Sequence, residues 1–305
     1  MRCYSDQPML GPNTGCATMK MRERGYYSVR TGKHPAGAKL DLPSVKKIFL
    51  SLHRQFTARD YFQEAFGYEC VDAGHIPGSL GEETAGAILV AIRKEGLWPL
   101  YDRISGYSED DLFDMIEFLY DHVSKPVDGY HHTYGGCGMH YSTFNRPEGQ
   151  AEYRMALSPI LGCYDSGYEL SERGEILALP ETGMAPLTAA SLPQHDPLNV
   201  EARVQDAVSR FRRHRSSLED RRHAIRDLAD VLEYLRPKVK EVLPSKDEAD
   251  LFNLANNFGI RHHNAKQKTN YDTAIWYSWM FYYYLSTIHA CVRLLNKPGQ
   301  PKGVA

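Results

Sequence analysis

Apolar residues recur at helical spacing along most of the chain, and the pattern is clearest in its last third. Amphipathic segments follow Asn199, Ser217 and Ser245, with apolar positions three or four residues apart. Ser217 and Ser245 each precede an acid by three residues, which is typical of a capping box at a helix N-terminus. A further helix over 274–295 is apolar almost all round. The pattern predicts four helices, the second of which should end or kink at Pro237.

The preceding 180 residues show a weaker pattern, in which helices are followed by one hairpin. Alternating apolar and polar residues around a glycine turn predict the hairpin over 168–179. This order resembles a winged-helix arrangement. Helices are expected over 42–66, 82–94, 108–122 and 150–161.

The chain of 305 residues is longer than one compact core usually needs, so two domains are expected. Four prolines between Pro180 and Pro197 predict a linker over 181–195. The fold class is then an α+β N-terminal domain over 1–180, mostly helical with a β-hairpin, followed by an all-α four-helix domain over 196–305.

The apolar last helix is long enough to cross a bilayer, but a membrane span is not expected. Ser278, Ser286, His289 and Arg293 interrupt it, so a central bundle helix or a dimer interface is favoured. No apolar leader precedes Lys20, which indicates a cytoplasmic protein. Six cysteines without paired spacing indicate reduced thiols rather than disulfides.

Opposite charges are concentrated in different segments. Acids crowd 109–121 and arginines crowd 210–226, whereas the formal net charge of −2 excludes a globally basic nucleic-acid binder. Solvated helix faces are the favoured interpretation of both runs. The alternative is that basic residues, Arg221 and Arg222 among them, steer a polyanion such as RNA.

A second polar segment suggests a metal site. A thiol and three imidazoles lie within ten residues, and Cys137 and His140 have the spacing of a zinc half-site. Cys70 and His75 offer a second pair with looser spacing. The alternative is a Tyr- and Gly-rich loop whose histidines bond backbone groups or a partner, so no metal or other cofactor is expected. The candidate ligands of this segment are His131, His132, Cys137 and His140.

The densest cluster of cationic, imidazole and amide side chains covers 256–267, between two apolar helical segments. Arginine can hold a phosphate and imidazole can transfer a proton near neutral pH. Four helices, with an Arg-initiated polar motif after the third and an aromatic last helix, resemble the HEPN superfamily of toxin and abortive-infection proteins. In the family a His follows the Arg with four to six residues between them, whereas Lys266, Gln267 and Lys268 occupy those positions after Arg261.

The resemblance implies a metal-independent endoribonuclease of the antiphage-defence type, acting in the cytoplasm as a homodimer with a composite site. Arg261 would stabilise the phosphorane, and His263 or His262 would transfer protons. No membrane or DNA partner is expected. The remaining RNA-binding candidates are Asn257, Asn264, Lys266, Gln267, Arg221 and Arg222.

Two alternatives remain open for this cluster. One is a non-catalytic module that binds RNA, a nucleotide or a partner protein, or that only dimerises. The other is a structural role, in which Arg261 and the histidines cap the C-terminal carbonyls of the third helix, where the macrodipole favours cations.

Overall fold

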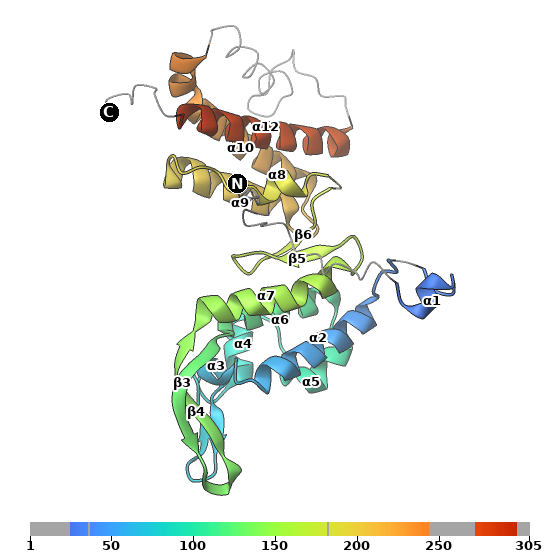
Figure 1. Ribbon diagram of the computed structural model, residues 1–305, viewed down its shortest axis with the longest axis vertical. Helices are drawn as coiled ribbons and strands as arrows, with labels where there is room; N and C mark the ends of the chain where they lie inside the picture. The colour runs from blue at the N-terminus through green and yellow to red at the C-terminus, as the bar shows by residue number, and fades with distance from the viewer. Residues whose placement is uncertain (1–24, 36, 182, 244–271, 298–305) are drawn as a thin grey trace, which may run out of the picture. The chain divides into compact units, whose positions relative to one another are not determined.

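The computed structural model describes residues 25–35, 37–181, 183–243 and 272–297. Contacts divide the chain into two units, Met1–Ala38 and Lys39–Ala305. In the first unit the described residues form one short helix, α1 (Tyr27–Arg30), with no buried residue. Everything that follows concerns the second unit (Figure 1).

The first core of this unit lies among three helices. Along α6 (Glu109–His122) the fully buried residues are three or four positions apart, including Leu112, Met115, Ile116 and Leu119. They pack with the buried faces of α2 (Leu42–Thr57) and α7 (Arg146–Gly162). The shorter helices of this region are α3 (Gln63–Phe66), α4 (Thr84–Ile92), α5 (Leu100–Arg103) and the 3₁₀ turn η1 (Ile104–Gly106).

The helix expected over 108–122 is present as α6, and it begins with a capping box. Asp111 N donates to Ser108 Oγ at 3.1 Å, and Ser108 N donates to Asp111 Oδ2 at 2.9 Å, which completes a capping box. The helices expected over 42–66 and 150–161 are also present, with different bounds. The first stops at Thr57, and the second begins at Arg146 behind an Asn145 cap.

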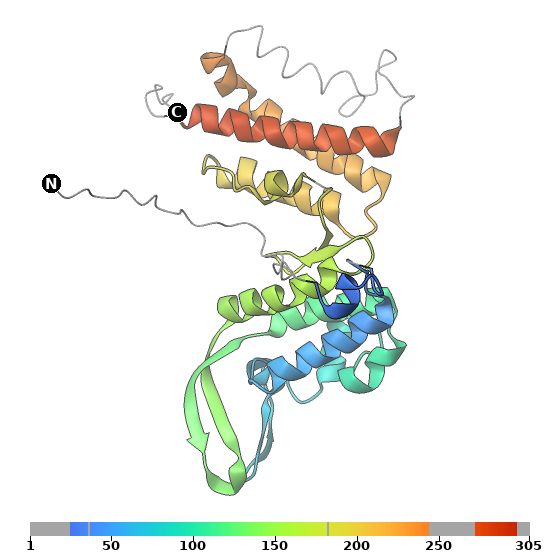
Figure 2. The ribbon, with the colours of Figure 1, turned by 45° about the vertical axis from the view of Figure 1, so that its right-hand side comes forward.

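In the part of the chain that the structure describes, three antiparallel hairpins accompany these helices (Figures 1 and 2). The expected hairpin over 168–179 is confirmed, with Tyr168 opposite Ala178. The other two hairpins were not predicted. Their strands, with those of the first, are β1 (Tyr68–Cys70), β2 (Gly74–Ile76), β3 (Lys125–His132), β4 (Gly138–Asn145), β5 (Tyr168–Leu170) and β6 (Ile176–Ala178).

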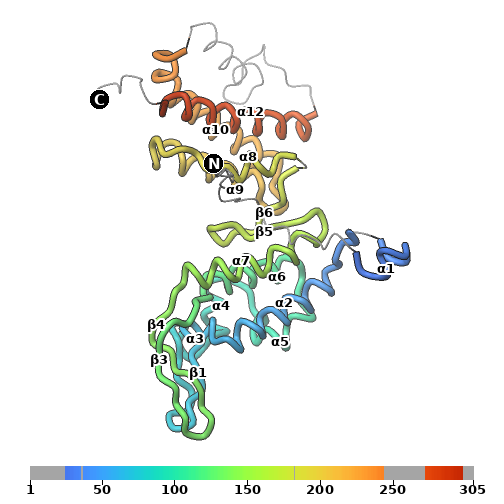
Figure 3. Tube along the Cα trace, in the orientation of Figure 1, coloured from blue at the N-terminus to red at the C-terminus, as the bar shows by residue number. Residues whose placement is uncertain are grey.

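The β3–β4 ribbon is long and contains two irregularities. Val127 on β3 and Ser142 on β4 have no paired residue on the opposite strand. Beyond these two residues the strands pair in the same register as before them. At Gly129 the strands approach so closely that a Cβ would lie 2.2 Å from His140 O, so only glycine fits. The tube view shows β1 beside the same ribbon (Figure 3).

A second core joins α9 (Ala202–Arg212), α10 (Leu218–Val242) and α12 (Thr273–Leu295). Its centre includes Phe211 stacked on Phe281, with ring centroids 3.9 Å apart. Before α9 lie the short α8 (Ala185–Ala189), inside the expected linker, and a π-helical turn, Pro197–Glu201. The capping box at Ser217 is confirmed, whereas the helix expected over 245–258 lies outside the described residues.

Two helix bounds in this region differ from the predicted ones. The segment expected to follow Asn199 begins earlier, because Asp196 accepts the Asn199 N–H at 3.1 Å and the helical turn begins at Pro197. α10 does not end at Pro237, since buried Leu235 and Val239 on either side keep the helix in the core as far as Val242.

The described helices include none with a stretch long and apolar enough to cross a membrane. Together they make the fold mixed, with helices and small antiparallel sheets.

Candidate metal centre

The polar cluster that dominates the sequence lies outside the described residues. It contains Arg261, His262 and His263, and with them the candidate contacts Asn257, Asn264, Lys266 and Gln267. Of the predicted site residues, the structure places the two arginines of α10 and the histidines and cysteines of the hairpins.

The register of β3 with β4 brings two histidines together. Tyr130 pairs with His140 and His132 with Gly138, so His132 and His140 lie on one face, two positions apart. Their ring centroids are 5.3 Å apart. His131 pairs with Met139 on the opposite face and is exposed.

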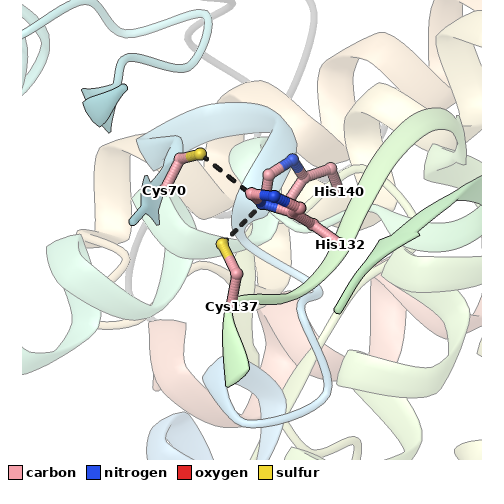
Figure 4. A group of neighbouring side chains, drawn as sticks. All are labelled: Cys70, His132, Cys137 and His140. Carbon is pink, nitrogen blue, oxygen red and sulfur yellow. Dashed lines mark hydrogen bonds between the residues drawn. The ribbon is translucent and has the colours of Figure 1, made fainter. Parts of the chain in front are cut away.

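Two thiols complete the group. Cys137 lies just after the 3₁₀ turn η2 (Tyr134–Gly136), which joins β3 to β4, and its Sγ is 3.1 Å from His140 Nε2. Cys70 comes from β1, and its Sγ is 3.8 Å from His132 Nδ1. Figure 4 shows all four side chains pointing toward one another. One possible ligand atom from each lies within 4.8 Å of every other.

These distances match a tetrahedral zinc site. Zn–N and Zn–S bonds of about 2.0–2.3 Å place neighbouring ligand atoms about 3.3–3.8 Å apart. The two thiol-to-imidazole distances, 3.1 and 3.8 Å, bracket that range. Two thiolates and two imidazoles are also a common donor set for structural zinc.

Each histidine has a hydrogen-bond partner for the ring nitrogen that faces away from the cluster. His140 Nδ1 is 2.7 Å from the Tyr130 hydroxyl, and His132 Nε2 is 3.2 Å from Asp72 Oδ2. Metal-binding histidines usually donate their second N–H to such a partner, which fixes the tautomer and the ring orientation. The inner nitrogens, His140 Nε2 and His132 Nδ1, are thereby left free to bind a cation.

The centre is sheltered on one side. His140 is 3% exposed, and the ring of Tyr68 lies 4.3 Å from its ring. Burial raises the pKa of Tyr68, and electrostatic interactions with Tyr130, Cys70 and Cys137 raise it further. The phenol of Tyr68 therefore stays neutral beside the thiols.

The structure combines part of the predicted ligand set with one residue from the looser pair. His132, Cys137 and His140 converge, and Cys70 joins them from a hairpin that the sequence did not reveal. His75 does not, because its Nδ1 bonds Glu69 Oε1 at 2.8 Å. The strand register that separates His132 from His131 could have been inferred only once β3 and β4 were recognised as a hairpin.

The arginine-rich run is largely ion-paired within the chain. Arg215 binds both Glu109 at 2.8 Å and Asp110 at 3.2 Å, so the basic run meets the acidic one. Arg222 is 3.9 Å from Glu219. The guanidinium of Arg221 lies over the Phe211 ring, 5.3 Å from its centroid. Further pairs are Arg210–Asp227, Arg212–Glu169 and Arg213–Glu175.

No family model matches the chain, and no curated protein or solved structure does either.

Proposed function

We propose that the protein binds one zinc ion through Cys70, His132, Cys137 and His140, and that the ion makes a rigid arm of two hairpins. The observation that carries this proposal is the convergence of four ligand atoms from β1, β3, β4 and the η2 turn, all within 4.8 Å of one another. Four protein donors fill a tetrahedral shell and leave no position for a catalytic water. The role of the metal is therefore structural.

The arm needs such a link because it has little core of its own. No residue of strands β1 to β4 belongs to the first hydrophobic core or to the partly buried apolar residues packed on it. A two-stranded hairpin without a packed face is only marginally stable in water. A zinc ion bound across β1 and β3–β4 would supply the missing stabilisation.

A stiffened arm would serve as a binding element. Near its tip the side chains of Val71, Tyr130 and Tyr134 are 52%, 61% and 69% exposed. Gly135 approaches Val71, where a Cβ would be 3.3 Å from Val71 Cγ1, so the two hairpin tips also touch. Tyrosines held rigidly on a surface are efficient contact residues, because little side-chain entropy is lost on binding.

Metal analysis of the purified full chain tests the proposal. Zinc should be present at about one equivalent, as tetrahedral structural sites require. Cobalt substitution should give the absorption of tetrahedral Co²⁺ with thiolate ligands. Cys70→Ser should remove the zinc, whereas Cys163→Ser, which changes an exposed thiol outside the cluster, should retain it. Equal zinc content in all three proteins, or none in the parent, would refute the site.

A second candidate function is cleavage of RNA by a dimeric, metal-independent endoribonuclease, as the HEPN resemblance and its four-helix domain imply. Within the described residues two features support it. The Nε of Arg221 is buried and has no hydrogen-bond partner there, so an anionic ligand would supply a missing acceptor. Ile275, 65% exposed on α12, suits a dimer contact.

This second proposal has its own test. The parent protein should cleave RNA in EDTA and leave 2′,3′-cyclic phosphate ends, and Arg261→Ala and His263→Ala should abolish cleavage without changing the thermal midpoint. Binding without turnover would indicate the non-catalytic module. A lower midpoint in both variants would indicate the structural role. Light scattering that gives a monomer mass would remove the composite site.

A further inference from the structure

A second polar site, distinct from the hairpin arm, is an open pocket of about 850 Å³. Its lining comes from stretches that are far apart in sequence: the segment before α2, the start of α6, the α7–β5 connection with the first residue of β5, the end of β6, and the α9–α10 connection with the first turn of α10. The residues used below are Lys39, Glu109, Tyr164, His214 and Arg221, and all of them line it.

Glu109 and His214 form an oriented pair in this pocket. Glu109 Oε2 is 2.9 Å from His214 Nε2 and 2.8 Å from Arg215 Nη2, and Oε1 accepts from the Tyr164 hydroxyl at 2.7 Å. Burial alone would raise the pKa of Glu109, but the hydrogen bonds from Tyr164 and His214 outweigh it and lower that pKa. An ionised carboxylate can only accept, so Nε2 of His214 carries a proton and Nδ1 is the nitrogen left for a ligand.

The imidazole is also fixed in orientation by its neighbours. The rings of Phe113 and Tyr168 meet it edge to face, at centroid distances of 5.2 and 5.0 Å. A carboxylate on one ring nitrogen and aromatic rings against the imidazole hold it as the acid of a catalytic triad holds its histidine. Little reorganisation is needed before Nδ1 can bond a ligand.

Two cations in the pocket form no ion pair with the described residues. Arg221 has a buried Nε without a hydrogen-bond partner among the described residues, and it forms no ion pair with them. Lys39, which also lines the pocket, likewise has no carboxylate partner in the part of the chain that the structure describes. A buried guanidinium donor without an acceptor costs free energy, and an anionic ligand would remove that cost.

The backbone around the pocket is strained. Asp165 and Arg215 have φ values of 45° and 55°, in the left-handed region that non-glycine residues seldom adopt. Both line the pocket. Backbone conformations of this kind are concentrated at functional sites.

A metal ion is the other ligand that this group of side chains could suggest, because Glu109, Asp110 and His214 lie close together. Arg215 argues against it. Its guanidinium already bonds both carboxylates, at 2.8 and 3.2 Å, and would repel a divalent cation at the same place. The arrangement therefore favours an anion.

We propose that this pocket binds a phosphate ester. Arg221 and Lys39 would contact the phosphate oxygens, and His214 Nδ1 would accept a hydrogen bond from a neighbouring hydroxyl of the ligand. The phosphate could belong to a small sugar phosphate or to an RNA strand, because both carry hydroxyls beside a phosphate. The site rests on neither the zinc centre nor the cluster at Arg261.

Calorimetric titration of the zinc-loaded full chain tests this pocket. Ribose 5-phosphate and a short RNA oligonucleotide are the two phosphate probes, and ribose is the control without phosphate. Saturable binding of a phosphate probe but not of ribose is expected. A preference for the oligonucleotide would identify a strand as the source of the phosphate, and a preference for ribose 5-phosphate would identify a small molecule.

Variants locate the binding. Arg221→Gln should weaken it by about tenfold or more, since a charge-assisted contact is lost. Arg226→Gln, on an exposed part of the same helix, should leave it unchanged. His214→Gln should weaken binding of the hydroxyl-bearing ester more than binding of inorganic phosphate. Circular dichroism confirms that each variant is folded. Equal affinities in Arg221→Gln and Arg226→Gln, or no saturable binding of either phosphate probe, would overturn the proposal.

Discussion

The hairpin arm and the pocket around His214 each gather ionisable side chains, but they balance charge in opposite ways. In the arm, two thiols and two imidazoles face one another, and no Lys or Arg of the described chain is ion-paired with them. In the pocket, the carboxylate of Glu109 already has a histidine, an arginine and a tyrosine as donors.

The difference shows which external ligand each cluster requires. Two cysteines and two histidines that face one another are a donor set for a metal cation, and the outward bonds of His132 and His140 orient the two rings to receive it. In the pocket the carboxylate of Glu109 has its own donors, whereas Arg221 and Lys39 form no ion pair with the residues that the structure describes. Proximity of acids and histidines is therefore a poor guide to metal binding unless the cations beside them are also considered.

Removing zinc should have the largest effect, because it should destabilise the hairpin arm and leave the region of the pocket unchanged. Chelation should raise hydrogen exchange at the amides of β3 and β4 by about two orders of magnitude, equivalent to about 2.7 kcal/mol of local stability. The amides of α6 and β5–β6, which support the pocket, should keep their protection. Exchange measured by mass spectrometry, with and without chelator, checks both regions at once. Uniform loss of protection would mean that the arm and the core unfold together.

Changing a residue that is hydrogen-bonded to a proposed zinc ligand should have a smaller effect. Tyr130→Phe removes the hydroxyl bonded to His140 Nδ1 and should weaken zinc affinity by about 10- to 100-fold. Tyr134→Phe is the matched control, because that side chain is 69% exposed on the same hairpin. Competition with a chromogenic chelator measures both. Similar affinities in the two variants would show that the Tyr130 bond does not orient the ligand.

Neutralising the carboxylate of Glu109 tests whether its bonds to His214 and Arg215 stabilise the protein. Glu109→Gln should lower the free energy of unfolding by about 1–3 kcal/mol, since His214 and Arg215 lose a charged acceptor. Asp110→Asn should cost less than about 1 kcal/mol, because Asp110 is 55% exposed and its pair with Arg215 is screened. Urea denaturation of the zinc-loaded proteins gives both values. Equal losses would mean that the inner carboxylate has no special role.

The pH dependence of that stability should be the smallest effect. The pKa of Glu109 is lowered from 4.5 in the fold, so its contribution is present above about pH 4.5 and disappears as pH falls through the lowered value. The stability difference between the parent protein and Glu109→Gln should therefore shrink in acid.

Glu117 provides the opposite case for this measurement. Burial raises the pKa of Glu117, and nearby acids raise it further against a backbone hydrogen bond from Ile176. The parent should therefore gain stability relative to Glu117→Gln as pH falls through the raised value. Parallel denaturation series at several pH values should give slopes of opposite sign, and slopes of the same sign would contradict the assignment.

Much of the helical structure could be predicted from local signals. The boxes at Ser108 and Ser217 each involve a side chain and a backbone amide three residues apart, so the sequence contains all of their information. The end of α9 could not be predicted in this way. The chain leaves the helix after Arg212, and a bridge between Arg213 and Leu177 holds it against β6, which is a contact between distant residues.

For the same reason, only part of the candidate metal site could be predicted from the sequence. Cys137 and His140 are neighbours in sequence, and their spacing pointed to a half-site. Cys70 reaches them only through the pairing of hairpins that are rich in glycine and histidine, residues with weak strand preference. The pocket was beyond sequence reasoning, because Glu109 and His214 are 105 residues apart.

The two irregularities of the β3–β4 ribbon constrain how this gene segment can change in length. Val127 and Ser142 are extra residues on opposite strands, so their effects on the strand register cancel. The pairing at the tip of the ribbon therefore continues the register of its base. Deleting only one of them would shift the strand register at the tip by one residue, which would turn His132 or His140 to the other face of the ribbon. Deleting both would shorten the ribbon and preserve the centre. Insertions and deletions in this arm should therefore survive only as compensated pairs, one on each strand.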